Sequence, residues 1–359
     1  MFKDKTLVVD ARMLDSAGIG TYLKQLIPFL SDAFLLTLLV RDFQPKWKSI
    51  DQVECDVPIY SVKEQWKLPF QIPPCDLFFS PHYNIPLLPI RAKKRCVTIH
   101  DVFHLAHLSS LKLSEKLYAK AVISQAVRRS DLIFTDSKFS YEEILRYSDA
   151  DPKKIHIIPL ACSSNMQSSI DFEKIQEKYD IPDTYFLFVG NVKPHKNLKG
   201  ILAAYQRSDD LPPLMVVGKK EGLLNQDDLQ DLFSEHPELH QKVHFLGKIP
   251  DHDLLPLFQN ALSLLFPSFY EGFGLPPLEA MRLGCPVIAS NCASIPEVCG
   301  DAVLYIDPYR PESIFDAMLQ MVKNPSIRQK YKQLGNERVK EFSWEKSAEM
   351  TIQAIEKIL

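Results

Sequence analysis

The sequence predicts an α/β protein of two domains, each built on a doubly wound parallel sheet. Short apolar runs of strand length alternate with segments of helical spacing along the whole chain. The runs are rich in Val, Ile, Leu and Phe and alternate little with polar residues, as in strands buried on both faces. The 359 residues are enough for about two domains. We therefore expect two Rossmann-like sheets that face each other across a cleft.

About six strands are expected in each half of the chain. Those of the first half are 7–11, 34–40, 76–80, 96–101, 132–136 and 155–159. Those of the second half are 185–189, 214–217, 243–246, 263–267, 287–290 and 303–307. The expected helices are 21–30, 113–129, 139–147, 197–206, 253–260, 275–283 and 312–322.

The domain boundary is expected in the Ser-rich stretch 162–169, which ends the first series of strands and helices. This gives an N-terminal, acceptor-side domain at 1–165 and a C-terminal, donor-binding domain at 166–340. Residues 325–359 are helical and include no strand. We expect the last helix, 341–359, to pack back on the N-terminal domain.

Composition excludes several classes of protein. Hydrophobic residues are 46% and charged residues 24%, which is typical of a globular protein and not of a disordered one. The formal net charge of −3 does not favour binding to nucleic acid. No apolar run approaches the roughly 20 residues of a membrane span. Charged residues interrupt the start of the chain, and the seven cysteines are scattered, so we expect a cytoplasmic protein with free thiols.

Ligands of open parallel sheets bind beyond the carboxyl ends of the strands, so the residues that follow strands are candidates. The densest group follows the strand at 263–267 and contains Glu271, Gly274, Leu275 and Glu279. Prolines at 276 and 277 predict a helix start, where N–H groups can bind an anion. The carboxylates suit the hydroxyls of a ribose or a sugar ring. A tight loop with an ordinary first-turn glutamate is an equally open interpretation.

Three further groups follow other expected strands. Gly190, Asn191, Lys193 and Lys196 offer positive charge for a phosphate, although a basic surface loop has the same pattern. His100 and Asp101 follow a buried strand, with His82 after the preceding one, and indicate either acid–base chemistry or structural histidines. Gly18, Gly20 and Tyr22 resemble a phosphate loop without the third glycine of a dinucleotide site.

Taken together, these motifs resemble the group 1 retaining glycosyltransferases of GT-B fold. The resemblance lies in Glu271 and Glu279 eight residues apart, followed by 282–291 and 295–302. Gly18-x-Gly20-x-Tyr22, His100-Asp101, Lys196-Asn197, residues 243–247 and residues 342–344 follow in the family's order. The resemblance covers nearly the whole chain and is strongest over 191–307. The chain departs from the family's pattern at Asn191 and His195, where arginine is common.

The resemblance implies a role for each of these residues. Glu279 would hold the ribose hydroxyls of a nucleotide sugar, and Glu271 those of the transferred sugar. Lys196 and the backbone of Phe273, Gly274 and Leu275 would bind the diphosphate, assisted by Gly190, Asn191 and Lys193. His100 would lie at the reacting centre, and Gly20 would let its loop approach phosphate and acceptor. Tyr22, His82 and Asp101 would lie on the acceptor side.

The expected activity is transfer of a hexose, by preference mannose, from a GDP- or UDP-sugar in surface polysaccharide biosynthesis. Retention of configuration is implied by the resemblance alone. No D-x-D motif follows an expected strand, so we expect no metal and no other cofactor. A nucleotide-sugar epimerase or phosphorylase of GT-B fold, and a non-catalytic nucleotide-binding module, are the alternatives.

The acceptor is expected to be a saccharide, free or linked to a lipid. Lys112, Lys116, Lys120, Arg128 and Arg129 give the expected helix 113–129 a basic face. Such a face can rest on the anionic inner face of a membrane. A solvated helix surface is the alternative, and it is the preferred interpretation because it is the commoner case.

Overall fold

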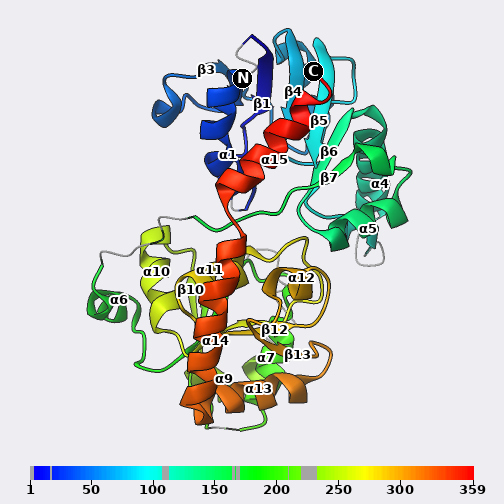
Figure 1. Cartoon of the computed structure of the whole chain (residues 1–359). Helices are drawn as coiled ribbons and strands as arrows, with labels where there is room; N and C mark the ends of the chain where they lie inside the picture. Colours follow the sequence, from blue (N-terminus) through cyan, green and yellow to red (C-terminus); the bar gives the residue numbers. More distant parts are fainter. Residues whose placement is uncertain are drawn as a thin grey trace. The chain divides into compact units, whose positions relative to one another are not determined.

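The structure, a computed structural model, describes residues 4–16, 18–106, 113–163, 166, 170–208, 210–219 and 233–359, with no side chains over 113–117. The chain forms two compact units, each considered by itself here (Figure 1). Unit 1 comprises Met1–Ala161 and Ser343–Leu359, and unit 2 comprises Cys162–Phe342. The predicted α/β class with two parallel sheets is confirmed.

Unit 1 contains a seven-stranded sheet in the order β3-β2-β1-β4-β5-β6-β7, with every neighbouring pair parallel. The strands are β1 (Thr6–Asp10), β2 (Leu35–Val40), β3 (Asp51–Glu54), β4 (Cys75–Ser80), β5 (Ala92–Thr98), β6 (Leu132–Thr135) and β7 (Ile155–Ile157). The order changes direction at β1 and β4, which makes their carboxyl ends the natural place for a ligand.

The helices of unit 1 include one from the far end of the chain. They are α1 (Ile19–Ala33), α2 (Val62–Gln71), α3 (Phe103–Ala106), α4 (Leu113–Arg129), α5 (Lys138–Tyr147) and α15 (Trp344–Glu356), with short 3-10 turns η1 (Pro45–Trp47) and η3 (Pro152–Lys154). Helix α15 packs against α1 and β6. The rings of Tyr22 and Trp344 are 6.1 Å apart, and Ser347 Oγ donates to the carbonyl of Pro159. Unit 1 is therefore built from both ends of the sequence.

Unit 2 contains a six-stranded parallel sheet in the order β10-β9-β8-β11-β12-β13. The strands are β8 (Phe186–Val189), β9 (Leu214–Val217), β10 (Val243–Gly247), β11 (Ser263–Phe266), β12 (Val287–Ser290) and β13 (Leu304–Ile306). Its helices are α6 (Phe172–Tyr179), α7 (Leu198–Tyr205), α9 (Leu239–Lys242), α10 (Asp251–Asn260), α11 (Leu275–Arg282), α12 (Ile295–Cys299), α13 (Pro311–Lys323) and α14 (Pro325–Arg338), with 3-10 turns η4 (Pro194–Lys196) and η5 (Val339–Glu341).

Both faces of the unit 2 sheet are buried. Leu187 of β8 belongs to one hydrophobic cluster, whereas its neighbours Phe186 and Phe188 belong to another. Successive side chains of a strand point to opposite faces, so one cluster lies on each face. This explains why the strand sequences show no alternation of apolar and polar residues.

Several boundaries differ from those expected. Strand β5 ends at Thr98 and not at 101, and β6 ends at Thr135 and not at 136. His100, Asp101 and Asp136 therefore lie in the loops at the carboxyl edge of the sheet. Part of the expected linker, residues 164, 165 and 167–169, lies outside the described residues. In the ranges that the structure describes, no helix combines the length and the apolar character needed to cross a bilayer.

Candidate active site

Two loops of unit 2 meet at an ion pair beyond the ends of β8 and β11. Lys196 Nζ lies 2.5 Å from Glu271 Oε1, and both side chains are largely buried. The ammonium also lies 5.3 Å from the centre of the Phe266 ring. The structure thus brings together a cation and a carboxylate that are 75 residues apart in the sequence. Both groups can bind a polar ligand, the cation through phosphate and the carboxylate through hydroxyls.

Hydrogen bonds to backbone carbonyls hold the loops that carry Lys196 and Glu271 in place. The N–H of Phe269 donates to the carbonyl of His195 at 2.8 Å, which joins the two loops. Ser294 Oγ lies 2.9 Å from the carbonyl of Glu271 and 2.8 Å from that of Phe273. The Phe273 side chain is buried and meets Phe342 edge-on at 5.8 Å, so only its backbone is open to a ligand role.

Helix α11 begins at Gly274 with open N–H groups. Gly274 has a φ of +110°, and no side chain caps the helix. The positive φ favours glycine here, and a Cβ would also lie 2.7 Å from Ile295 Cδ1, so the isoleucine side chain would have to shift. Pro276 and Pro277 have no N–H, which leaves Gly274 and Leu275 as the donors at the positive end of the helix. These two N–H groups are a candidate anion site in the same loop as Glu271.

Glu279 lies one turn into α11 and carries an unusual carboxyl group. Its side chain is half-buried, and loss of hydration, assisted by the Asp251 carboxylate, raises its pKa to about 7. Across the part of unit 2 that is described, no cation forms an ion pair with it. A carboxylate that is poorly hydrated and has no cation for a partner is poised to accept hydrogen bonds from ligand hydroxyls.

Gly190 and Gly218 let the ends of β8 and β9 turn closely past each other. Gly190 has a φ of +145° and lies beside the Lys196 side chain. Gly218 has a φ of +148°, and a Cβ on it would lie 2.0 Å from the Gly190 carbonyl oxygen. Asn191 and Lys193 follow on the surface of the turn, and both are exposed.

We expect Gly218→Ala to destabilise unit 2 by at least about 3 kcal/mol, because the clash is with backbone and the φ is unfavourable for alanine. Gly247→Ala is the matched control, since Gly247 has a φ of +71° but open space around it. It should cost about 1 kcal/mol. Urea denaturation of both variants measures the difference. Equal losses would show that the contact with Gly190 does not matter.

His100 of unit 1 is held at both ring nitrogens. Nδ1 lies 2.7 Å from Asp136 Oδ2, and Nε2 lies 3.0 Å from the carbonyl of Pro81. Both partners are acceptors, so only the doubly protonated ring satisfies both contacts. Burial by itself would lower the pKa of His100, but the Asp136 carboxylate outweighs it and the pKa is raised. The geometry therefore favours a cationic His100.

The other unit 1 residues of the predicted site surround His100 in different ways. The Tyr22 ring is buried, meets His100 edge-on at 5.3 Å and contacts Thr98 through its hydroxyl, so it supports the histidine from below. Asp101 is half-buried, and its Oδ1 accepts from the N–H of Phe103. Gly20 lies within α1, where a Cβ would be 2.4 Å from the Leu14 carbonyl oxygen. Glycine is needed there for packing, whatever its role toward substrate.

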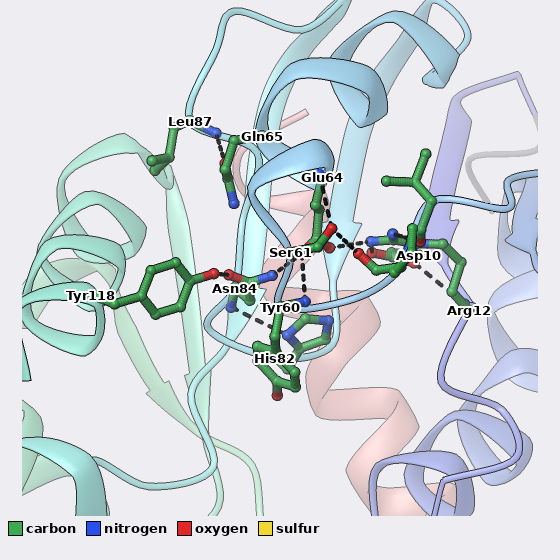
Figure 2. A network of polar contacts seen from close by, with 12 residues as sticks. Asp10, Arg12, Tyr60, Ser61, Glu64, Gln65, His82, Asn84, Leu87 and Tyr118 are labelled. Atoms are coloured by element: carbon green, nitrogen blue, oxygen red, sulfur yellow. Dashed lines mark hydrogen bonds and ion pairs between the residues drawn. The ribbon is translucent and has the colours of Figure 1, made fainter. Parts of the chain in front are cut away.

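His82 is buried and belongs to a polar network beneath this edge (Figure 2). Its Nδ1 accepts from the N–H of Asn84, burial lowers its pKa to about 4, and its Nε2 has no partner in the part of the chain described. Asn84 joins Glu64 to Tyr118, and Glu64 pairs with Arg12, which pairs with Asp10. Both arginine contacts measure 2.6 Å. His82 is therefore a neutral, enclosed residue and not an exposed acid or base.

Asp136→Asn should lower the pKa of His100, because it removes the charge that stabilises the imidazolium. Because the pKa of His100 is raised in the folded state, its protonation adds to the free energy of unfolding. This contribution is complete at pH values below the ordinary pKa of histidine, and it is lost as the pH rises through the pKa of the folded state. The variant should therefore lose this pH dependence of its melting temperature. ¹⁵N NMR titration of the ring and pH profiles of activity measure the change, with the alkaline limb of activity moving to lower pH. An unchanged ring titration would refute the assignment.

Two of the five basic residues expected on α4 have partners within the protein. Arg128 pairs with Asp149 at 2.9 Å, and Arg129 donates to Gln125 and to the carbonyl of Leu87. Lys120 is exposed. Lys112 and the side chain of Lys116 lie outside the described residues. Arg128 and Asp149 are both exposed, so their ion pair leaves the guanidinium at the surface.

Two residues that matter here were not predicted. Asp136 follows β6, as His100 follows β5. The candidate residues are those that follow strands, but the sequence pattern places Asp136 inside the expected strand 132–136, whereas β6 ends at Thr135. Ser294 lies before α12, far from the loop it holds, and no local pattern marks it. Sequence reasoning also missed Arg12 and Glu64, whose charges are fully buried.

Comparison with known proteins identifies the family and the fold. Residues 171–338 match the family model of glycosyl transferases, group 1. The O-antigen chain mannosyltransferase B of Escherichia coli is 34% identical over 277 residues, covering 74% of this chain and 71% of that protein. Sucrose-phosphate synthase of Thermosynechococcus elongatus shares the fold with a TM-score of 0.78 and 18% identity over 98% of both chains. HepE of Anabaena, in a complex with UDP-glucose, has a TM-score of 0.74 and 15% identity over 99% of this chain and 100% of its own.

Two parallel Rossmann-like sheets, in the arrangement shared with these solved structures, define the GT-B fold. The chain belongs to the group 1 glycosyltransferases. It is a hexosyltransferase, as the resemblance in the motifs implied.

Proposed function

We propose that the protein transfers mannose from a GDP- or UDP-sugar to a saccharide acceptor, free or lipid-linked, in the assembly of a surface polysaccharide. The observation that carries this is the Lys196–Glu271 pair beside the open start of α11. It supplies one cation, two backbone donors and one carboxylate within a single loop pair. The mannosyltransferase relative supports the choice of sugar.

The proposed chemistry follows from the charges. Breaking the bond between sugar and diphosphate leaves a negative diphosphate and an oxocarbenium-like sugar. Lys196 and the N–H groups of Gly274 and Leu275 stabilise the leaving charge without reorganising, which is the largest effect that fixed donors offer. When the diphosphate binds Lys196, the ion pair between Lys196 and Glu271 weakens. The Glu271 carboxylate can then accept hydrogen bonds from the hydroxyls of the sugar. Glu279 accepts the ribose hydroxyls, and unit 1 presents the acceptor.

The test is a panel of nucleotide sugars, GDP- and UDP-linked, scored by release of free nucleoside diphosphate with and without saccharide acceptors. We expect release with GDP- or UDP-mannose that rises when an acceptor is added. Formation of an isomeric nucleotide sugar without acceptor would indicate an epimerase, and binding without turnover would indicate a non-catalytic module. Retention is checked by the anomeric configuration of the product.

A further inference from the structure

Helix α2 exposes large apolar side chains along one side. Val62 is 75% exposed, Trp66 64% and Phe70 75%. They are spaced four residues apart and therefore lie on one face of the helix. We call them the α2 apolar row. A contiguous row of exposed apolar side chains usually marks an interaction site.

The opposite face of α2 is firmly held. Glu64 is fully buried and pairs with Arg12, Leu68 is fully buried, and Gln65 Oε1 accepts from the N–H of Leu87 at 2.8 Å (Figure 2). Ser61 caps the helix by accepting from the N–H of Glu64. These contacts fix the rotation of α2 about its axis, so the helix cannot turn the apolar row inward. The exposure is a property of the fold.

The exposed charged residues of α2 are both positive. Lys63 and Lys67 are exposed and lie on the helix surface next to the row. Glu64, the third charged residue of the helix, is fully buried against Arg12 and does not reach the outward surface. That surface is therefore positive and apolar. Aromatic and basic residues in this arrangement are the pattern of a helix that lies in the headgroup region of a membrane.

We propose that α2 docks the protein on an anionic lipid surface, with Val62, Trp66 and Phe70 in the interface and Lys63 and Lys67 against the headgroups. A second copy of the chain is a poorer partner, because a two-fold contact through α2 would bring the lysines of both copies together. The surface differs from the basic face expected on α4, where Arg128 and Arg129 have partners in the protein. The inference holds whichever sugar the enzyme transfers.

Trp66 makes the docking directly visible. The protein has three tryptophans, and the other two, Trp47 and Trp344, are buried with 8% and 4% exposure. Tryptophan emission of the full chain is measured with vesicles of phosphatidylcholine alone and of phosphatidylcholine mixed with phosphatidylglycerol. We expect a blue shift, quenching by brominated chains and flotation with the anionic vesicles, all weakened by salt.

Surface variants separate the two contributions. Lys63→Ala with Lys67→Ala should weaken binding to anionic vesicles about 30-fold, since each lysine near such a surface contributes about a factor of five. Phe70→Ala should weaken it by more than about tenfold and retain the Trp66 reporter. Phe43→Ala is the matched control, since Phe43 is another exposed aromatic residue of unit 1 and lies outside α2, and this variant should bind as wild type. Unchanged melting temperatures show that each variant is folded.

Three outcomes would overturn the proposal. One is the absence of both emission shift and flotation with anionic vesicles at low salt. Another is binding that Lys120→Ala abolishes while the α2 variants retain it, which would place the contact on α4. The third is a blue shift without vesicles that grows with protein concentration together with dimer formation in light scattering, which would assign the row to a second copy of the chain.

Discussion

Lys196→Ala is expected to lower nucleotide-sugar turnover by about 100- to 1000-fold, the usual loss when one preorganised stabiliser of a developing charge is removed. Lys196 is the cation that the structure places against Glu271, 2.5 Å away, beside the start of α11. Without it the diphosphate faces an unneutralised carboxylate. The loss should therefore appear both in turnover and in affinity for the nucleoside diphosphate.

Binding measurements locate the effect. The variant should bind a nucleoside diphosphate much more weakly than wild type but a nucleoside without phosphate equally well, because the lysine acts on phosphate. Lys323→Ala, an exposed lysine at the end of α13, serves as the control and should behave as wild type. A folded Lys196→Ala protein that keeps wild-type turnover would remove the basis of the proposed donor site.

Glu279→Gln is expected to weaken donor binding about 10- to 100-fold while making the protein more stable at alkaline pH. The pKa of Glu279 is raised to about 7, so the folded state binds a proton that the unfolded state releases near its ordinary value. Glu279 therefore does not lower the free energy of unfolding at pH values below its pKa in the unfolded state. As the pH rises from there toward 7, the free energy of unfolding falls. Glutamine carries no such penalty, so its advantage should be about 2–3 kcal/mol at pH 8 and vanish at about pH 4.

Thermal unfolding at several pH values, with donor titration in parallel, checks both halves of this prediction. Asp251→Asn is the companion variant, since the Asp251 carboxylate contributes to the raised pKa. It should lower the pKa of Glu279 and leave donor binding intact at pH 8. A Glu279→Gln protein with unchanged donor affinity would show that the carboxylate serves the fold and not the ligand.

The sequence predicts the sheets well because parallel strands that are buried on both faces consist almost entirely of apolar residues. Strand β3 was not predicted, since Asp51–Glu54 lies at the edge of the sheet and is largely polar. Helix α2 was not predicted either. Three of its apolar residues, Val62, Trp66 and Phe70, face outward, and Glu64 is buried beside Leu68, so its pattern departs from the usual relation between polarity and burial.

The candidate site was predictable as far as it depends on strand ends. Lys196 and Glu271 lie in the loops that follow β8 and β11, which are neighbouring strands of the unit 2 sheet, so the topology brings these loops together. His100 lies in the loop that follows β5 of unit 1. What escaped prediction depends on contacts between distant segments. The Arg12–Glu64 pair joins residues 52 apart, and Ser294 reaches back 23 residues to the carbonyl of Glu271. Such pairings are fixed by the packed fold and leave no local signal.

The return of α15 to unit 1 also has a consequence for the order of synthesis. Trp344, which lies against Tyr22 behind His100, leaves the ribosome only after every residue of unit 2 has been made. The nascent first lobe must wait with α1 uncovered until translation is almost finished, so a chaperone has a long interval in which to bind it. Loss of the last helix through premature termination would leave a finished donor lobe beside a first lobe that never closes its core.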